Sequence, residues 1–385
     1  MKYLIFGAGL QGRIVGYDIL NFEKDAEVIY ADVLQDNLKT AREIVGEDRV
    51  RFENVDINDE EASVALMKES DVVIICLPHD LPTTTKVYNC LAQAEGKKVV
   101  FSDYWLWDKH HEFHDALAEA DVLAVPGLGI APGFANICVG QLEHEFDELE
   151  EAIIYVGGLP VERGVCPLDY MELFNLEAML DMYITPSTVY EDGEVTQKPI
   201  LTVFDKLIIP GHGETEVFWT DGLCSLEKTM AGKGIKKLAE TTLRWPGHIE
   251  QMKFLYDLGY LSTEPIDVNG VQVTPKDVSE KIFQKLWEKK PGVRDMTYLK
   301  VVGKGKKDGV FCEKYYELKG YSDEEKGITS MESTTAYPIS IAALILAKDD
   351  TGLRGVISPE LYFIGDKFDE MVEALGKREL NVYSG

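Results

Sequence analysis

From Lys2 to Val125 the chain alternates short β-branched runs with amphipathic stretches, and this alternation restricts the folds that it can adopt. Several runs are apolar at consecutive positions, so helices must cover both faces of the strands that they form. Buried strands separated by helical stretches predict a parallel sheet in a doubly wound α/β domain over residues 1–125. The six runs are YLIFG, EVIYAD, VRFENV, DVVIICL, KVVFSD and DVLAVPG.

The first of these strands continues directly into GAGLQG, which fits the pattern G-x-G-x-x-G. Gly7 permits a tight turn, Gly9 allows a pyrophosphate to approach the backbone, and Gly12 lets the following helix pack on its strand. The helix is expected to begin at once, over Leu10 to Leu20, so that its N-terminus faces the phosphates. A strand, this motif and a helix in succession predict a Rossmann-type dinucleotide site.

Asp32 is expected at the end of the second strand, where a carboxylate binds the adenine ribose hydroxyls and repels a 2′-phosphate. Neither Val33 nor Leu34 supplies an arginine for such a phosphate, so NAD is favoured over NADP. Arg13 is expected at the pyrophosphate edge, and Asp56 lies either beside the adenine or at a helix entry. The other expected cofactor contacts are Leu10, Gln11, Cys76, Leu77 and Pro78.

After the loop Pro126 to Gly133 the strands become longer, which predicts a second, α+β domain over residues 126–333. The longer runs are EAIIYVGG, PILTVFDKLIIPG and TEVFWTDGL, and Lys300 to Tyr316 is typical of a hairpin around KGKKDG. We expect this domain to bind the substrate. Its sheet either mediates dimerisation or is covered by the chain's own helices.

The C-terminal part contains an apolar helix, Thr334 to Ala347, that is too hydrophobic for a free tail. We expect this helix to pack on the first domain, and residues 348–385 to pack on the rest of the protein. The same region contains the longest apolar helix-like run, Ile339 to Ala347, which is too short to span a bilayer. No membrane partner is expected.

Acidic residues outnumber basic ones by 67 to 39, and the formal net charge of -28 argues against a nucleic-acid partner. Six cysteines are scattered without C-x-x-C spacing, and no secretory signal precedes the first strand. We therefore expect a reducing, cytoplasmic setting. His110, His111 and His114 fail the pattern H-E-x-x-H because Asp115 occupies the last position, so we expect a solvated helix face and no metal.

Several further segments occur in an order that is specific to one group of proteins. They are GLGIAPGFAN, IYVGGLP, CPLDYMELFNLEAMLDMY, WTDGL, LRWPGH and TTAYPISIAA, in addition to GAGLQG. Together they span nearly the whole chain, which resembles the saccharopine dehydrogenase-like superfamily and, within it, the lysine 6-dehydrogenases. The resemblance implies a Rossmann domain joined to an α+β substrate domain. The homodimer is expected from the long strands of the second domain and not from the resemblance.

The resemblance also implies a reaction, the NAD-dependent oxidation of the 6-amino group of L-lysine. Its products would be ammonia and allysine, which cyclises to piperideine-6-carboxylate. Saccharopine reductases usually carry an aspartate at Ala131, a cysteine at Val156 and an arginine at Glu177. An arginine suits the extra carboxylates of a glutamyl adduct and a glutamate suits an ammonium, so the departure favours a small basic amino acid.

A lysine site needs a fixed cation for the carboxylate and an anion for an ammonium group. Arg244 is the candidate for the carboxylate, unless it forms a salt bridge that holds its loop. Glu177 and Asp103 are candidates for the ammonium ends, and Tyr104 for a substrate hydrogen bond. Asp103 and His248 are candidates for the general base, although either residue could instead serve at a helix N-terminus.

Two alternatives remain open at this point. One is a saccharopine or carboxynorspermidine reductase, which would join two substrates by reductive condensation. The other is a non-catalytic sensor that binds NAD but has lost the chemistry.

Overall fold

The computed structural model describes residues 1–78, 80–102, 107–348 and 351–385, and the chain forms two compact units. Unit 1 contains Met1–Phe146, Cys224–Ala231 and Glu332–Val382. Unit 2 contains Asp147–Leu223, Gly232–Met331 and Tyr383–Gly385. Unit 1 thus includes residues 126–146 and 224–231, which the sequence analysis placed in the second domain. No helix in the described ranges is long and apolar enough to cross a membrane.

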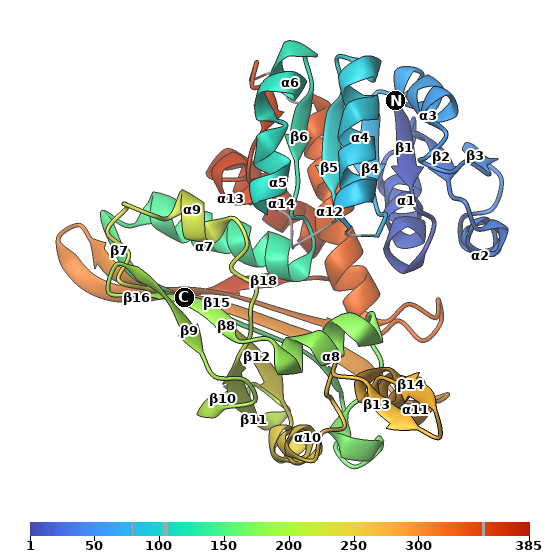
Figure 1. The fold of residues 1–385 in the computed structure, drawn as a ribbon. Coiled ribbons are helices and arrows are strands. Elements are labelled where there is room, and N and C mark those ends of the chain that lie inside the picture. Colours follow the sequence, from blue (N-terminus) through green and yellow to red (C-terminus); the bar gives the residue numbers. More distant parts are fainter. Residues whose placement is uncertain (79, 103–106, 349–350) are drawn as a thin grey trace. The chain divides into compact units, whose positions relative to one another are not determined.

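Unit 1 is built on a seven-stranded sheet of order β17-β6-β5-β4-β1-β2-β3, and its strand pairs are parallel. The predicted doubly wound α/β domain is therefore confirmed (Figure 1). The order reverses between β1 and β4, which is where ligands bind in open sheets of this kind. The strands are β1 (Lys2–Phe6), β2 (Glu27–Ala31), β3 (Val50–Glu53), β4 (Val72–Ile75), β5 (Lys98–Phe101), β6 (Leu123–Val125) and β17 (Gly355–Val356).

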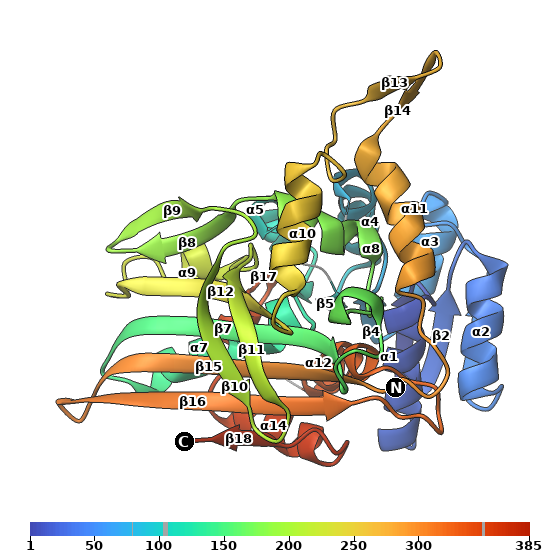
Figure 2. The same ribbon diagram turned by 90° about the horizontal axis from the view of Figure 1, so that it is seen from below.

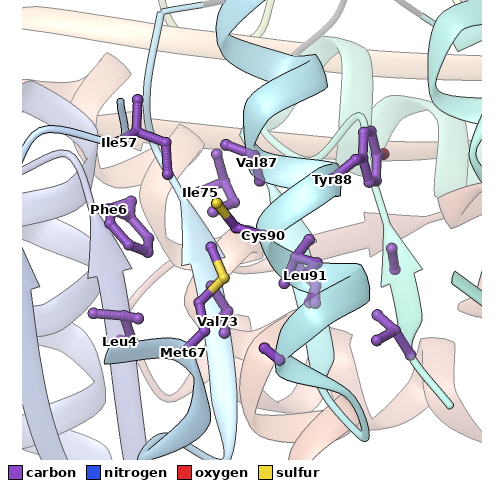
Figure 3. Close-up of a cluster of buried hydrophobic side chains, with 14 of the residues drawn as sticks. Leu4, Phe6, Ile57, Met67, Val73, Ile75, Val87, Tyr88, Cys90 and Leu91 are labelled. Atoms are coloured by element: carbon purple, nitrogen blue, oxygen red, sulfur yellow. The ribbon is translucent and has the colours of Figure 1, made fainter. Parts of the chain in front are cut away.

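The helices of unit 1 cover the sheet, and one covered face holds a continuous apolar core. Strand side chains such as Leu4, Phe6 and Val73 lie there against Met67 of α3 and Leu91 of α4 (Figure 3). The helices are α1 (Leu10–Phe22), α2 (Gln35–Val45), α3 (Glu60–Lys68), α4 (Leu81–Ala94), α5 (Trp107–Glu112), α6 (His114–Glu119), η1 (Ile130–Phe134), α7 (Ala135–Glu145), α9 (Leu226–Thr229), α12 (Ser330–Lys348), α13 (Pro359–Tyr362) and α14 (Asp366–Gly376). The expected helix Thr334 to Ala347 lies within α12.

The histidines of the sequence HHEFH do not form a solvated face, so that prediction was wrong. His110 is 1% exposed, and its Nδ1 lies 2.5 Å from the Tyr88 hydroxyl. The backbone N–H of Val356 in β17 donates to Nδ1 of His114 at 3.1 Å. Two of the three rings therefore hold the sheet and its neighbouring helices together. Among the described residues, no group of three potential metal ligands is present.

A buried ion pair fixes the C-terminal segment to α1. Arg378 follows α14, and its Nε and Nη2 both donate at 2.7 Å to the two carboxylate oxygens of Asp18. Both side chains are nearly inaccessible, with exposed fractions of 3% and 1%. Ser340 of α12 donates to the same carboxylate. This pair therefore connects three helices that are far apart in the sequence.

Unit 2 is built on a nine-stranded mixed sheet of order β10-β11-β12-β7-β15-β16-β18, with β8 and β9 branching from β12. Figure 2 shows its long strands β7, β15 and β16 side by side. The predicted hairpin is β15–β16, and it turns at Asp308 and Gly309, which both have positive φ. The strands of the nine-stranded sheet are β7 (Glu148–Pro160), β8 (Ser187–Glu191), β9 (Glu194–Lys198), β10 (Val203–Ile209), β11 (Gly213–Trp219), β12 (Lys237–Arg244), β15 (Asp295–Lys307), β16 (Val310–Tyr321) and β18 (Val382–Ser384).

The helices of unit 2 are short, and three of them contribute to one apolar cluster around Trp287. They are η2 (Pro167–Asp169), α8 (Leu176–Ile184), α10 (His248–Asp257) and α11 (Pro275–Leu286). A separate small hairpin consists of β13 (Ile266–Val268) and β14 (Val271–Val273). The cluster places α8, α10 and α11 together, and the candidate substrate site is built beside it.

Candidate cofactor and substrate sites

The glycine-rich loop between β1 and α1 has the shape that a bound pyrophosphate requires. A Cβ on Gly7 would overlap the carbonyl oxygen of Cys76, and one on Gly12 would overlap that of Gly7. At Gly9, by contrast, no heavy atom of the described residues lies within 4 Å of the position of a Cβ, and none of their side chains caps the N-terminus of α1. The residues present therefore fit a dinucleotide whose phosphates approach the helix over Gly9.

The carboxylate of Asp32 is held firmly at the end of β2. Its Oδ2 accepts hydrogen bonds from the backbone N–H of Ala8 at 2.7 Å and from the Asn37 amide at 3.0 Å. Its Oδ1 accepts from the backbone N–H of Leu34 at 2.7 Å. The residue is buried and connects β2 to the glycine-rich loop. This position fits the proposed contact with a ribose.

Two of the expected cofactor contacts, Arg13 and Asp56, interact with other side chains of unit 1. Arg13 forms an ion pair with Glu332 of α12, with 2.5 Å between Nη2 and Oε1. Asp56 is exposed and accepts hydrogen bonds from the backbone N–H and the side-chain amide of Asn58, while Asp59 caps α3. Asp59, and not Asp56, is therefore the cap of the helix, and the contact of Asp56 with an adenine stays a prediction. The other contacts differ in exposure: Leu10 and Pro78 are exposed, and Gln11, Cys76 and Leu77 are half-buried.

The open space at Gly9 leads to a prediction. The φ of Gly9 is -70°, which alanine adopts without strain, so Gly9→Ala should leave the melting temperature unchanged. The added methyl group would occupy the approach to the pyrophosphate, and we expect dinucleotide affinity to fall about tenfold or more. Calorimetric titration with NAD measures this loss. Gly12→Ala is the contrasting variant, because its overlap with Gly7 should destabilise unit 1 itself.

In unit 2, Arg244 ends β12 as one of the most deeply buried side chains of the molecule, with 2% exposed. Its Nε donates to the Tyr183 hydroxyl at 3.1 Å, and its Nη1 donates to the carbonyl of Leu243 at 2.9 Å. The Tyr170 ring lies 4.8 Å from its Cζ. No acidic side chain within the described ranges forms an ion pair with this guanidinium, so the salt bridge left open by the sequence is not what holds it.

A chain of hydrogen bonds continues from Arg244 to Leu168 in η2. The Tyr183 hydroxyl lies 2.7 Å from Nε2 of His248, whose Nδ1 lies 2.7 Å from the carbonyl oxygen of Leu168. Because a carbonyl only accepts, Nδ1 carries the proton, and Tyr183 donates to Nε2. Burial and the nearby Arg244 charge lower the pKa of His248 to about 3. The imidazole is therefore neutral, and it orients Tyr183.

The sequence LRWPGH forms the corner between β12 and α10. Consecutive strand residues point to opposite faces, so Trp245 lies on the other side of the sheet from Arg244. Its Nε1 donates to the carbonyl of Pro160 at 2.9 Å. Gly247 takes a φ of 93°, a left-handed conformation that favours glycine, and α10 begins with His248. The corner thus brings Arg244 and His248 to the same network.

The other predicted substrate residues are Glu177, Asp103 and Tyr104. Glu177 is exposed in the first turn of α8, and Asp103 and Tyr104 lie outside the described residues. Sequence reasoning missed Tyr170 and Tyr183, which both contact Arg244. Both are deeply buried within the apolar cluster, and in the sequence such an aromatic residue resembles an ordinary core position.

The comparisons with known proteins cover both units. The model of the saccharopine dehydrogenase C-terminal domain matches residues 129–380, and that of the saccharopine dehydrogenase NADP binding domain matches residues 3–125. The chain belongs to the saccharopine dehydrogenase family. The superfamily resemblance inferred from the motifs is therefore confirmed.

Two members of the saccharopine dehydrogenase family illustrate the similarity. A saccharopine dehydrogenase [NADP(+), L-glutamate-forming] from Pyricularia oryzae is 23% identical over 240 residues, which are 60% of this chain and 52% of that protein. The chain thus spans about half the length of this relative. An apo saccharopine dehydrogenase (L-Glu forming) from Saccharomyces cerevisiae has the same fold, with a TM-score of 0.82, 19% identity, and coverage of 100% of this chain and 99% of that one. Both relatives are named for saccharopine, and neither is named for lysine 6-dehydrogenation.

Proposed function

We propose that the protein oxidises the distal primary amine of a basic amino acid with NAD, and that L-lysine is its substrate. The overall reaction converts R-CH₂-NH₃⁺, NAD⁺ and water into R-CHO, NH₄⁺, NADH and a proton. The observation that carries this proposal is Arg244, a buried guanidinium to which no acidic side chain of the described chain is paired. A buried charge is expensive unless it is paired, and the planar fork of arginine matches a carboxylate.

The residues of unit 2 would bind and orient the amino acid. Arg244 would accept its carboxylate, and the Tyr170 ring below the guanidinium restricts the direction in which the fork can point. Tyr183 fixes that fork by accepting a hydrogen bond from Nε of Arg244, and His248 fixes Tyr183 by accepting one from its hydroxyl. They act as positioning residues in this proposal, because both nitrogens of His248 already have protein partners.

The residues of unit 1 would hold the dinucleotide. Gly7, Gly9 and Gly12 shape the loop, and Asp32 would bind a ribose. When bound, the nicotinamide accepts a hydride. Hydride can leave the carbon only from a neutral amine, whose unperturbed pKa is near ~10.4, so a base must take a proton from the substrate. Asp103 remains our proposal for that base, since the geometry supports an orienting role for His248.

The preference for NAD rests on Asp32 and gives a prediction. We expect Asp32→Ser to lower kcat/KM for NAD and to raise it for NADP, because the repulsion of the 2′-phosphate is removed. The ratio of the two should change by about 10- to 100-fold, as expected for hydrogen bonds to a charged group. The ratio is the appropriate measure, since Asp32 also anchors Ala8 and Leu34, and a looser loop would weaken both cofactors alike. An unchanged ratio in steady-state assays would contradict the role assigned to Asp32.

A second candidate function is the reductive condensation of lysine with 2-oxoglutarate, or its reverse, because the relatives are named saccharopine dehydrogenases. One screen separates the two functions. NAD or NADP reduction is followed with lysine, ornithine or saccharopine, and ammonia is assayed in the same wells. Our proposal requires lysine-dependent reduction with equimolar ammonia. Reduction with saccharopine that yields no ammonia would replace it with the second function.

A further inference from the structure

Glu240 is a buried carboxyl in the middle of β12, with 6% of its surface exposed. Alternate residues of a strand share a face, so Glu240, Thr242 and Arg244 point to the same side of the sheet. Thr242 lies between the two charged residues, and its hydroxyl contacts Thr220 at 3.0 Å and the sulfur of Met182 at 3.7 Å. One face of a single strand therefore carries both a buried cation and a buried acid.

The carboxyl of Glu240 has no oppositely charged partner among the described residues. Its Oε2 is inaccessible and has no hydrogen-bond partner among the described residues, none of whose basic side chains forms an ion pair with it. A Cβ on Gly222 would overlap the carboxyl, so the chain leaves space for it there by having a glycine. Asp221 lies beside it, and burial together with this second carboxylate raises the pKa of Glu240 to about 8. Two carboxyl groups lie close together here, and a bound cation would stabilise them. The described residues of unit 2 do not supply that cation.

Such an arrangement is unusual for a purely structural residue. Burial of a carboxyl without a partner opposes folding, and an apolar side chain at this position would pack without that penalty. Glu360 of unit 1 is a partial contrast: its Oε2 also has no hydrogen-bond partner among the described residues, but its Oε1 accepts from the Thr229 hydroxyl at 2.6 Å. Unpaired buried acids with shifted pKa values occur preferentially at functional sites.

We propose that Glu240 binds the distal ammonium group of the amino acid whose carboxylate Arg244 binds. This inference rests on the proposed function and specifies its substrate class. Four residues of strand separate the two Cα atoms by about 13 Å, and the two long side chains shorten the distance that a ligand must span. Met182, which has a flexible side chain, contacts Thr242, the strand residue between them. The pair selects α-amino acids with a long aminoalkyl chain and rejects those with a neutral or short one.

The test compares L-lysine with L-norleucine, which has the same carbon chain but no distal amine. Calorimetric titration of the intact protein should show that lysine binds at least tenfold more tightly than norleucine. Glu240→Gln should weaken lysine binding and leave norleucine binding unchanged, so that the preference disappears. Glu360→Gln is the matched control, a buried glutamate outside the site, and it should keep the preference. Arg244→Met should weaken both ligands.

A second variant keeps the test decisive if Glu240→Gln folds poorly. Glu240→Asp withdraws the carboxylate by one methylene, so the preferred ligand should become homolysine, which is one methylene longer than lysine. The inference is overturned if the wild-type protein does not discriminate, or if Glu240→Gln keeps the lysine preference. Binding is measured without turnover, so a protein that prefers lysine but never reduces NAD with it would refute the proposed reaction and leave the role of Glu240 intact.

Discussion

Arg244→Met is expected to lower the affinity for the amino-acid substrate by about 10²-fold or more, while the protein stays as stable as before. Truncating a buried, hydrogen-bonded charge of a binding pair typically costs about 2 to 5 kcal/mol of binding free energy. The stability of the free protein should not fall, because the guanidinium has no carboxylate partner among the described residues and methionine fills a similar volume. Substrate titration and thermal unfolding of the same preparation measure the two effects.

Dinucleotide affinity provides the control for this variant, because the glycine-rich loop and Asp32 belong to unit 1. It should be unchanged in Arg244→Met. A loss of several kcal/mol in stability with normal substrate binding would mean that Arg244 is a structural residue. It would also remove the observation on which the proposed function depends.

Asp18→Asn is expected to destabilise the protein by about 3 to 5 kcal/mol, since it leaves the Arg378 guanidinium buried without its counter-charge. Urea unfolding monitored by circular dichroism measures the change. The amide protons of α1 and α14 should exchange faster than those of unit 2. Replacing both partners by apolar residues, as in Asp18→Leu with Arg378→Met, should recover much of the loss. No recovery in the double variant would indicate that packing around α1, and not charge pairing, is what the single variant damages.

These two variants form a matched pair. Arg244 and Arg378 are both almost wholly buried, but only Arg378 has a carboxylate partner. Loss of a buried arginine interaction that stabilises the fold should lower the free energy of unfolding. Loss of one that binds a ligand should lower the affinity for that ligand. The expected results are therefore opposite for the two sites: Arg244→Met should affect binding, and Asp18→Asn should affect unfolding.

The fold could be predicted from the sequence because its strongest signals are local. The alternation of buried runs and helical stretches, with GAGLQG at the first turn, predicts the parallel sheet of unit 1. The strand β17 was missed because two residues, Gly355–Val356, show no periodicity. The segment Cys224–Ala231, which belongs to unit 1, is too short to reveal which core it joins.

The candidate site could be predicted only in part. Arg244 and His248 were found through the short sequence LRWPGH. The strand KLAETTLR contains Glu240, Thr242 and Arg244 at every second position, a pattern that is typical of a strand with one face in water. The structure buries that face through contacts such as Met182 on Thr242 and Tyr183 on Arg244. Contacts between residues about sixty positions apart leave no trace in local periodicity, so Glu240 was missed.

The hydrogen bonds that run from Arg244 through Tyr183 and His248 to Leu168 have a consequence for kinetics. Burial raises the pKa of Tyr183, the pKa of His248 is about 3, and an arginine remains protonated at all pH values of interest. No member of this chain changes its charge between about pH 4 and pH 10, so the recognition of a carboxylate should be constant over that range. Any inflection in kcat/KM near neutrality must then come from other groups, such as the substrate amine, its base or Glu240. An inflection in the pH profile near neutrality would therefore report on groups outside this chain of hydrogen bonds, with the substrate amine among them.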